Sequence, residues 1–292
     1  MKRHMLFPAI MISALAMSAP AVEAGSAYKA KRETVTDASG VKVVSVKAKA
    51  GRLNILGEAG GDEVRASGTA HAPTREALDA VDLKAYRDGD RLVVEVSSRH
   101  WVPPTKGHEQ KGKSMAEEPA VYLDLKVVVP VGLPVEVESL WGPMDVRHVG
   151  GLTIRAERSD ITVEDVSGDL RVACGEGEID ARSVTGDAAV SIRNGEIRIA
   201  GVTGNVTVGR HPAGELIISD VGGNVVVPAH GRGDMAVSNV AGDLIVDDDE
   251  GGDIRYRDIG GRVTRPKSGP PKEVRERQKR KRELREKNAG KP

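Results

Sequence analysis

Residues 170–205 read LRVACGEGEIDARSVTGD and then AAVSIRNGEIRIAGVTGN, two 18-residue units that match position by position. The pattern extends on both sides of this stretch, first with a period of 18 residues and then with a period of 19. Self-similarity at a fixed period of this size is typical of stacked repeat proteins. The other units start at Leu133 (a less regular unit), Leu152, Val206, Val225 and Leu244.

Each unit predicts two strands. The first opens with alternating apolar residues such as Leu152 and Ile154, which places them on one face of a strand. A segment rich in Gly, Asp, Glu and Asn follows and predicts a turn before the second strand. Two apolar columns then recur: Ile161, Ile179, Ile197, Leu216, Met235 and Ile254, and further on Val166, Val184, Val202, Val221, Val240 and Ile259.

A glycine closes each unit, and an Asp or Asn follows it in the five units between the first and the last. A recurring glycine indicates a turn that needs either a positive φ or a close approach of backbones. Asp and Asn also tolerate left-handed turn geometry. We therefore predict that these glycines form the structural repeat turns: Gly168, Gly186, Gly204, Gly223, Gly242 and Gly261.

The repeat predicts an all-β fold, a single-stranded β-solenoid of 18–19-residue rungs resembling a β-helix. Aromatic residues make up only 2% of the chain, so the interior is expected to consist of Val, Ile, Leu and Ala. Like residues would then stack over like residues at the strand spacing of about 4.8 Å. An antiparallel sandwich with short hairpins is the alternative, but matched columns at a fixed period favour the solenoid.

The motifs Gly177-Glu178-Ile179 and Gly195-Glu196-Ile197, with Val184-Thr185-Gly186-Asp187 and Val202-Thr203-Gly204-Asn205, resemble a known family. This is the bacterial putative-adhesin family of β-strand-repeat domains of unknown function. The resemblance covers about Val41 to Val263. It implies a β-solenoid of the cell envelope, and it supplies no catalytic residues.

Residues 1–24 have the features of a signal peptide, with Lys2 and Arg3 before an apolar run from Met5 to Met17. Cleavage is expected after Ala24 or Ala21. The sequence therefore predicts an exported protein of the periplasm or cell surface, with no transmembrane segment in the mature chain.

Residues 25–132 are predicted to be β-rich without a repeat and to cap the solenoid, whose repeat part spans 133–264. A short helical turn is expected within Thr74–Val81, and a long mobile loop over Arg99–Glu118. The candidate strands are Val41–Val46, Arg52–Leu56, Glu63–His71, Leu92–Ser98 and Val121–Val129.

The segment 265–292 carries twelve basic and four acidic residues, whereas the whole chain has no net charge. This tail is predicted to be flexible or helical. It could tether the protein to an anionic polymer of the envelope, or it could be a solvated extension that discourages end-to-end stacking. No specific nucleic-acid partner is predicted.

The sequence predicts no enzyme and no cofactor. One alternative is a β-helical enzyme that cleaves polysaccharide, since acids recur in a column at Glu178, Glu196, Glu215, Asp234 and Asp253. However, a catalytic pair would be unique rather than repeated, and sugar sites usually offer aromatic platforms, which are scarce here. His148, His211 and His230 show no metal-ligand spacing and are expected in turns or on the surface.

A second alternative is a calcium-binding repeat protein, because 18 is twice the nine-residue period of such repeats. The candidate ligands are Asp247, Asp248, Asp249 and Asp253, with Glu250 beside them. A solvated acidic turn explains the same residues.

Three further residues attract attention. Cys174, the only cysteine, is predicted to be a buried, unreactive thiol opposite Ala156 and Ile192. Trp141 is expected to cap the first rung, and Trp101 is a candidate binding anchor. The resulting prediction is a non-enzymatic scaffold or binding module, with exposed arginines such as Arg193, Arg198, Arg255 and Arg257 available for contact.

Overall fold

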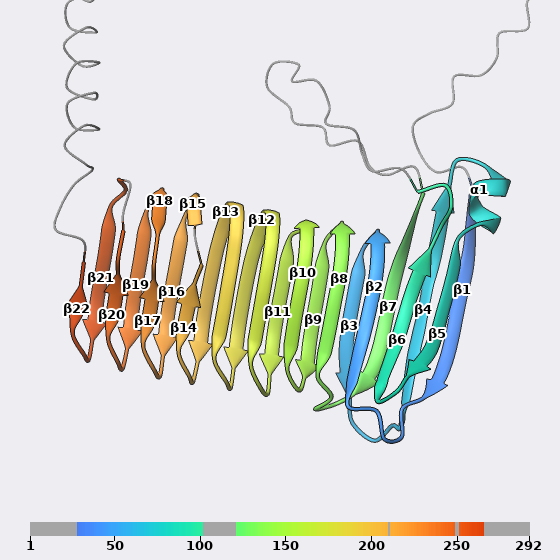
Figure 1. Ribbon diagram of the computed structural model, residues 1–292, viewed down its shortest axis with the longest axis horizontal. Helices are drawn as coiled ribbons and strands as arrows, with labels where there is room; N and C mark the ends of the chain where they lie inside the picture. The colour runs from blue at the N-terminus through green and yellow to red at the C-terminus, as the bar shows by residue number, and fades with distance from the viewer. Residues whose placement is uncertain (1–27, 102–120, 210, 249–250, 266–292) are drawn as a thin grey trace, which may run out of the picture.

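The computed structural model describes residues 28–101, 121–209, 211–248 and 251–265. About two thirds of them lie in strands, and most of these strands stack into one elongated β-solenoid (Figure 1). The predicted signal peptide, most of the predicted loop 99–118 and the tail beyond residue 265 lie outside the described residues. In the described part of the chain, no helix has the length and apolar character needed to cross a membrane.

The repeat part forms the predicted parallel stack. The first strands of successive rungs pair in register into one wall, which we call wall A, and the second strands form wall B. The equivalences run from Leu152 to Leu170 in wall A and from Ile161 to Ile179 in wall B. The strands of this part are β8 (Val135–Trp141), β9 (Met144–Val149), β10 (Leu152–Arg158), β11 (Ile161–Val166), β12 (Leu170–Val184), β13 (Ala188–Val202), β14 (Val206–Val208), β15 (His211–Ala213), β16 (Leu216–Val221), β17 (Val225–Val227), β18 (His230–Arg232), β19 (Met235–Val240), β20 (Leu244–Val246), β21 (Ile254–Ile259) and β22 (Val263–Thr264).

Both predicted apolar columns are confirmed by this register, and their members are buried up to the last rung. The predicted turn between the two strands is wrong for two rungs, because β12 and β13 each run unbroken from wall A into wall B. In these rungs the glycine-rich segment bends a continuous strand instead of ending it.

The N-terminal part contributes two rungs out of chain order. β2 (Val43–Ala50) pairs with β8, and β3 (Leu53–Glu58) pairs with β9. The next rung outward is made by β6 (Arg91–Ser97) and β7 (Tyr122–Pro130), which pair in parallel with β2 and β3. The β2–β3 rung therefore lies between two rungs that come later in the sequence. One apolar core runs from this part into the repeats, from Ala38 to Val246.

Antiparallel strands end the stack on this side (Figure 1). β4 (Glu63–Ala72) pairs with β7 and with β1 (Tyr28–Asp37), and β5 (Asp82–Asp88) pairs with β6. The predicted helical turn is present as α1 (Arg75–Asp79), capped by Thr74. Arg32 on β1 donates to the carbonyl oxygens of Leu78 and Val81 at 3.0 and 2.9 Å, which fastens the helix to the outermost strand.

Left-handed backbone does not occur at the closing glycines, for which the sequence allowed either a positive φ or a close approach of backbones. It recurs one residue before the valine column, as at Asp165 (φ 56°) and Asp220 (φ 58°). This bulge explains how Val163 and Val166 both point inward although they are three residues apart. The closing glycines do not have positive φ; instead, a Cβ on Gly186 would overlap the backbone of Gly168 and the side chain of Asp169.

The Asp or Asn after each closing glycine builds a ladder between rungs. The Oδ1 atom of each accepts the backbone N–H of its counterpart in the next rung, as from Asn205 to Asp187 (2.7 Å) and from Asp243 to Asn224 (2.7 Å). The ladder runs from Asp169 to Arg262. These side chains thus tie rungs together at the turn edge, a role that the sequence pattern did not predict.

We expect Asn224→Ala to lower the free energy of unfolding by about 1 kcal/mol, because the N–H of Asp243 loses its acceptor at a partly solvated edge. Asn224→Asp keeps an oxygen at that position and should change stability by less than about 0.5 kcal/mol. Urea unfolding of both variants measures the difference, and equal losses would show that the side-chain oxygen does not stabilise the stack.

A second glycine column lines the opposite bend, where wall A turns into wall B. A Cβ on Gly195 would overlap the carbonyl oxygen of Gly177, and a Cβ on Gly214 would overlap that of Gly195. Gly195 also has a φ of 142°. The column holds a single serine, Ser159, whose hydroxyl donates to the carbonyl oxygen of Gly142. The full set is Gly51, Gly142, Ser159, Gly177, Gly195, Gly214, Gly233 and Gly252.

Candidate functional site

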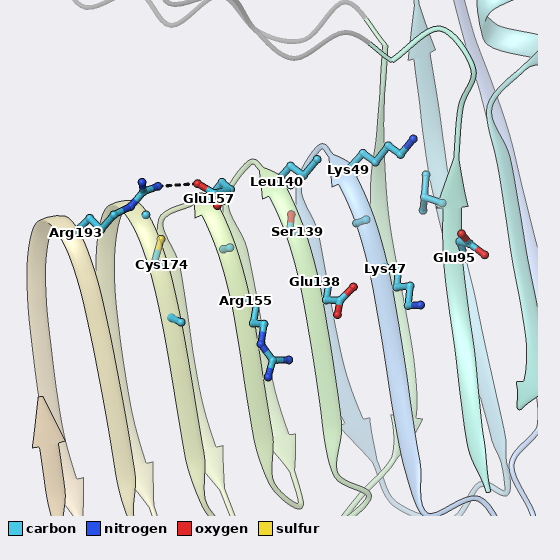
Figure 2. A pocket seen from close by; sticks show the side chains of 15 residues that line it. Lys47, Lys49, Glu95, Glu138, Ser139, Leu140, Arg155, Glu157, Cys174 and Arg193 are labelled. Atoms are coloured by element: carbon cyan, nitrogen blue, oxygen red, sulfur yellow. Dashed lines mark hydrogen bonds and ion pairs between the residues drawn. The ribbon is translucent and has the colours of Figure 1, made fainter. Parts of the chain in front are cut away.

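The outer face of wall A carries a groove of about 630 Å³. It crosses six neighbouring strands in the order β6, β2, β8, β10, β12 and β13 (Figure 2). Because side chains alternate between the two faces of a strand, the outward residues form two rows across the rungs. Small inward residues occupy the positions between these rows: Ala48, Ser139, Ala156 and Cys174.

The first row consists of Glu95, Lys47, Glu138 and Arg155, each a cross-strand partner of the next, so charge alternates along the groove. Glu95 accepts a hydrogen bond from the Tyr86 hydroxyl at 3.1 Å. Within the described residues, the side chains of Lys47, Glu138 and Arg155 make no hydrogen bond or ion pair. These three groups are therefore available to a ligand.

The second row consists of Lys49, Leu140, Glu157 and Arg193. Arg193 Nη2 lies 2.7 Å from Glu157 Oε2, two rungs away, and passes over Gly175 (Figure 2). A Cβ on Gly175 would overlap the backbone carbonyl oxygen of Glu157, so glycine is required beneath this ion pair. Leu140 is 40% exposed, an apolar group in the middle of a charged row.

Cys174 lies where the sequence predicted, with Ala156 and Ile192 as its register partners and 6% of its surface exposed. Burial raises the pKa of the thiol, and its Sγ lies 3.4 Å from the carbonyl oxygen of Glu176. The thiol therefore stays protonated near neutral pH and is a poor nucleophile.

The recurring acids form a structural edge. The backbone N–H of Glu178 donates to Asp160 Oδ1 at 3.1 Å, and that of Asp253 donates to Asp234 Oδ1 at 3.2 Å. Others pair with arginines on wall B: Arg198 lies 2.6 Å from Glu196, and Arg255 lies 3.2 Å from Asp253. Asp160 and Asp234 thus join neighbouring rungs, whereas Glu196 and Asp253 pair with arginines of their own rung. They also engage two of the arginines predicted to be free for contact.

The candidate calcium loop is only partly described. Asp247 and Asp248 are exposed, and Asp249 lies outside the described residues. The part of the chain that the structure describes contains no group of three or more His, Cys, Asp or Glu side chains able to hold a metal.

The predicted surface position is wrong for two of the three histidines. His211 and His230 are 0% and 1% exposed and lie inside the solenoid. His148 is at the surface, with Nδ1 3.2 Å from Asp165 Oδ2. The prediction failed because the 19-residue rungs carry one extra residue before the bend. Counted from the start of the rung, His211 and His230 therefore do not align with Ile192, the inward residue of the shorter rung to which they are equivalent.

The tryptophans differ from expectation. Trp141 does not cap the first rung, because β2 stacks before β8 and places Ala50 opposite it. Lys49 Nζ lies 5.9 Å from the centre of the Trp101 ring, and the indole Nε1 of Trp101 is buried without a hydrogen-bond partner among the described residues.

No protein-family model matches the sequence, and no curated protein matches it. The fold is similar to solved structures of three bacterial proteins. One, from Clostridium sporogenes, is described as a putative cell adhesion protein (13% identity, 81% of this chain and 98% of that one, TM-score 0.32). One from Bacteroides fragilis is described as a putative adhesin (9% identity, 82% of this chain and 98% of that one, TM-score 0.35). One from Parabacteroides distasonis is described as a putative lipid binding protein (13% identity, 82% of this chain and 98% of that one, TM-score 0.32).

At such identities and TM-scores the similarity specifies no ligand for this chain.

Proposed function

We propose that this protein is a non-catalytic, exported scaffold that binds an extended, polar chain of another envelope component in the wall A groove. The observation that carries the proposal is the first row of the groove, in which Lys47, Glu138 and Arg155 alternate in charge and are left without partners among the described residues.

The dimensions of the groove support an elongated ligand. Six strands at the inter-strand spacing give a length of about 24 Å. The backbone of these strands is already paired within the wall, so a ligand would bind through the side chains of the two rows. Leu140 adds an apolar contact near the centre of the second row.

Two features support a non-catalytic role. The thiol at the groove has a pKa raised by burial, which disfavours the thiolate that nucleophilic chemistry needs. At the bend, the carboxylates of Asp160 and Asp234 accept backbone N–H groups of the next rung, which is a structural role. Export is supported by the basic and apolar residues of segment 1–24, and an envelope setting is supported by the motif resemblance.

A photo-crosslinking amino acid placed at Ala173 tests the site, because this exposed alanine lines the groove. Ala189 is the matched control, since it is exposed on the same wall one rung further on and does not line the groove. Incubation with envelope extract should give a defined crosslinked product at Ala173 only, and excess unlabelled protein should compete with its formation. Equal crosslinking at both positions would contradict the groove as the binding site.

Charge reversal is expected to abolish this product. The double variant Lys47→Glu/Arg155→Glu turns the first row uniformly acidic and should weaken ligand binding at least about tenfold. Arg182→Glu on wall B is the control and should bind as the wild type does, because its ion pair with Asp180 lies away from the groove. Circular dichroism should show both variants folded, since the altered side chains are exposed.

A further inference from the structure

The interior of the solenoid contains two stacked histidines in neighbouring rungs. His211 on β15 pairs in register with His230 on β18, and their ring centres are 5.4 Å apart. Each lies three residues before the glycine of the bend, as Ile192 does in the rung before. Two imidazoles thus continue a column that is aliphatic in the previous rung.

The outer nitrogen of each ring has a fixed role. His211 Nε2 lies 2.9 Å from the carbonyl oxygen of Gly195, and His230 Nε2 lies 3.0 Å from that of Gly233. A carbonyl oxygen only accepts, so each Nε2 must carry a proton. In a neutral ring the Nδ1 is then an acceptor without a hydrogen.

The two Nδ1 atoms face each other at 3.4 Å in hydrogen-bonding geometry. If both rings are neutral, two lone pairs oppose each other in a buried site. One added proton completes the set: the protonated ring donates through both nitrogens, and the other ring accepts at Nδ1. A second proton would place two imidazolium ions in contact inside an apolar core, which is strongly unfavourable.

We infer that His211 and His230 form a buried site for one proton, held between their Nδ1 atoms, and that a second proton destabilises the rungs that carry them. The site is distinct from the groove and does not depend on the proposed ligand.

No charged side chain of the described residues points at the two histidines, so each imidazole interacts electrostatically mainly with the other. The neighbouring charged side chains of the described residues all point to solvent; they are Arg193 on β13, Glu215 before β16, Arg232 on β18, Asp234 before β19 and Asp248. Arg210, Asp249 and Glu250 lie outside the described residues. Burial, and to a lesser extent the charge of His230, lower the pKa of His211.

The cost of placing a second proton in this buried pair gives the direction of the pH dependence. Below about pH 6.5 the unfolded chain protonates both histidines, whereas the folded protein resists the second proton. The unfolded state therefore binds more protons, and stability falls as the pH decreases. Between about pH 6.5 and 5 the unfolding equilibrium constant should rise by up to tenfold per pH unit.

The double variant His211→Ile/His230→Ile tests this inference, because it restores the residue type found at Ile192. Urea unfolding between pH 5 and 8 should show the acid-side slope in the wild type and a nearly flat profile in the double variant. His148→Gln removes an exposed histidine and should keep the wild-type slope. An unchanged slope in the double variant would overturn the inference.

Nitrogen-15 NMR of the wild-type imidazoles provides a test that does not depend on a variant folding. Both Nε2 atoms should stay protonated from pH 8 to 5, while a single proton titrates onto the two Nδ1 atoms. A neutral ring with its proton on Nδ1 would contradict the site. So would resonances that shift on addition of Zn²⁺ at pH 7, since they would identify a metal as the occupant.

Discussion

Gly195→Ala is expected to lower the free energy of unfolding by at least about 3 kcal/mol, or to prevent folding. The added Cβ would overlap the carbonyl oxygen of Gly177, and the backbone has a φ of 142°, which L side chains rarely adopt. Both strands of this contact are held in register on either side of the bend, so neither can move away independently. Urea unfolding, with circular dichroism as the signal, measures the loss.

Substitutions at two exposed glycines separate the two contributions to this stability loss, which are the overlap with the neighbouring rung and the positive φ. Gly60 has a φ of 83° and open space around it, so Gly60→Ala should cost only the conformational penalty of about 1 kcal/mol. Gly61 has neither a positive φ nor a neighbour within 4 Å, so Gly61→Ala should leave stability nearly unchanged. A loss at Gly195 no larger than that at Gly60 would show that the rungs are not as close at this bend as the structure places them.

Ile197→Ala should destabilise the protein by about 2–5 kcal/mol. Ile197 is fully buried between Ile179 and Leu216 in the inward column of wall B, and a narrow interior of aliphatic side chains has few neighbours able to fill the cavity. Chemical denaturation again provides the measurement.

Ile217 is the matched control for Ile197. It lies on the adjacent strand of the same wall, opposite Arg198, and its side chain is only half-buried on the outer face. Ile217→Ala should therefore cost less than about 1 kcal/mol. Equal losses at the two positions would mean that the inward and outward faces of wall B are assigned incorrectly.

The repeat could be predicted from the sequence because its information is local and repeated. Each rung contains its own alternating apolar residues and its own closing glycine, and six copies place the inward columns without ambiguity. The bulge at Asp165 and its equivalents could not be predicted in the same way. Ser183 and Gly201 occupy the same position as the Asp residues, so residue type does not reveal the left-handed backbone there.

The arrangement of the N-terminal rungs could not be predicted, because it depends on pairing between distant segments. β2 lies between β6 and β8, which come much later in the chain. The sequence of β2 does not indicate which strands it pairs with. β1 and β5 were not anticipated either. They are polar edge strands, with few apolar residues to mark them as strands.

The groove could not be predicted either, because it also depends on pairing between segments that are distant in the sequence. Its rows combine Lys47 and Glu95 from the non-repeating part with Glu138 and Arg155 from the repeats. Each of these residues alone reads as a solvated charge on a strand. Only the register of β6, β2, β8 and β10 brings them into one row.

The most direct test of the account is capture of an envelope component by three forms of the protein across a salt series. These are the wild type, the chain ended after residue 264, and the Lys47→Glu/Arg155→Glu variant. The account predicts that the wild type and the shortened chain capture the same component with the same dependence on salt, and that the groove variant does not capture it. Capture that requires residues 265–292 and survives the groove substitutions would contradict it, and would place binding on the basic tail.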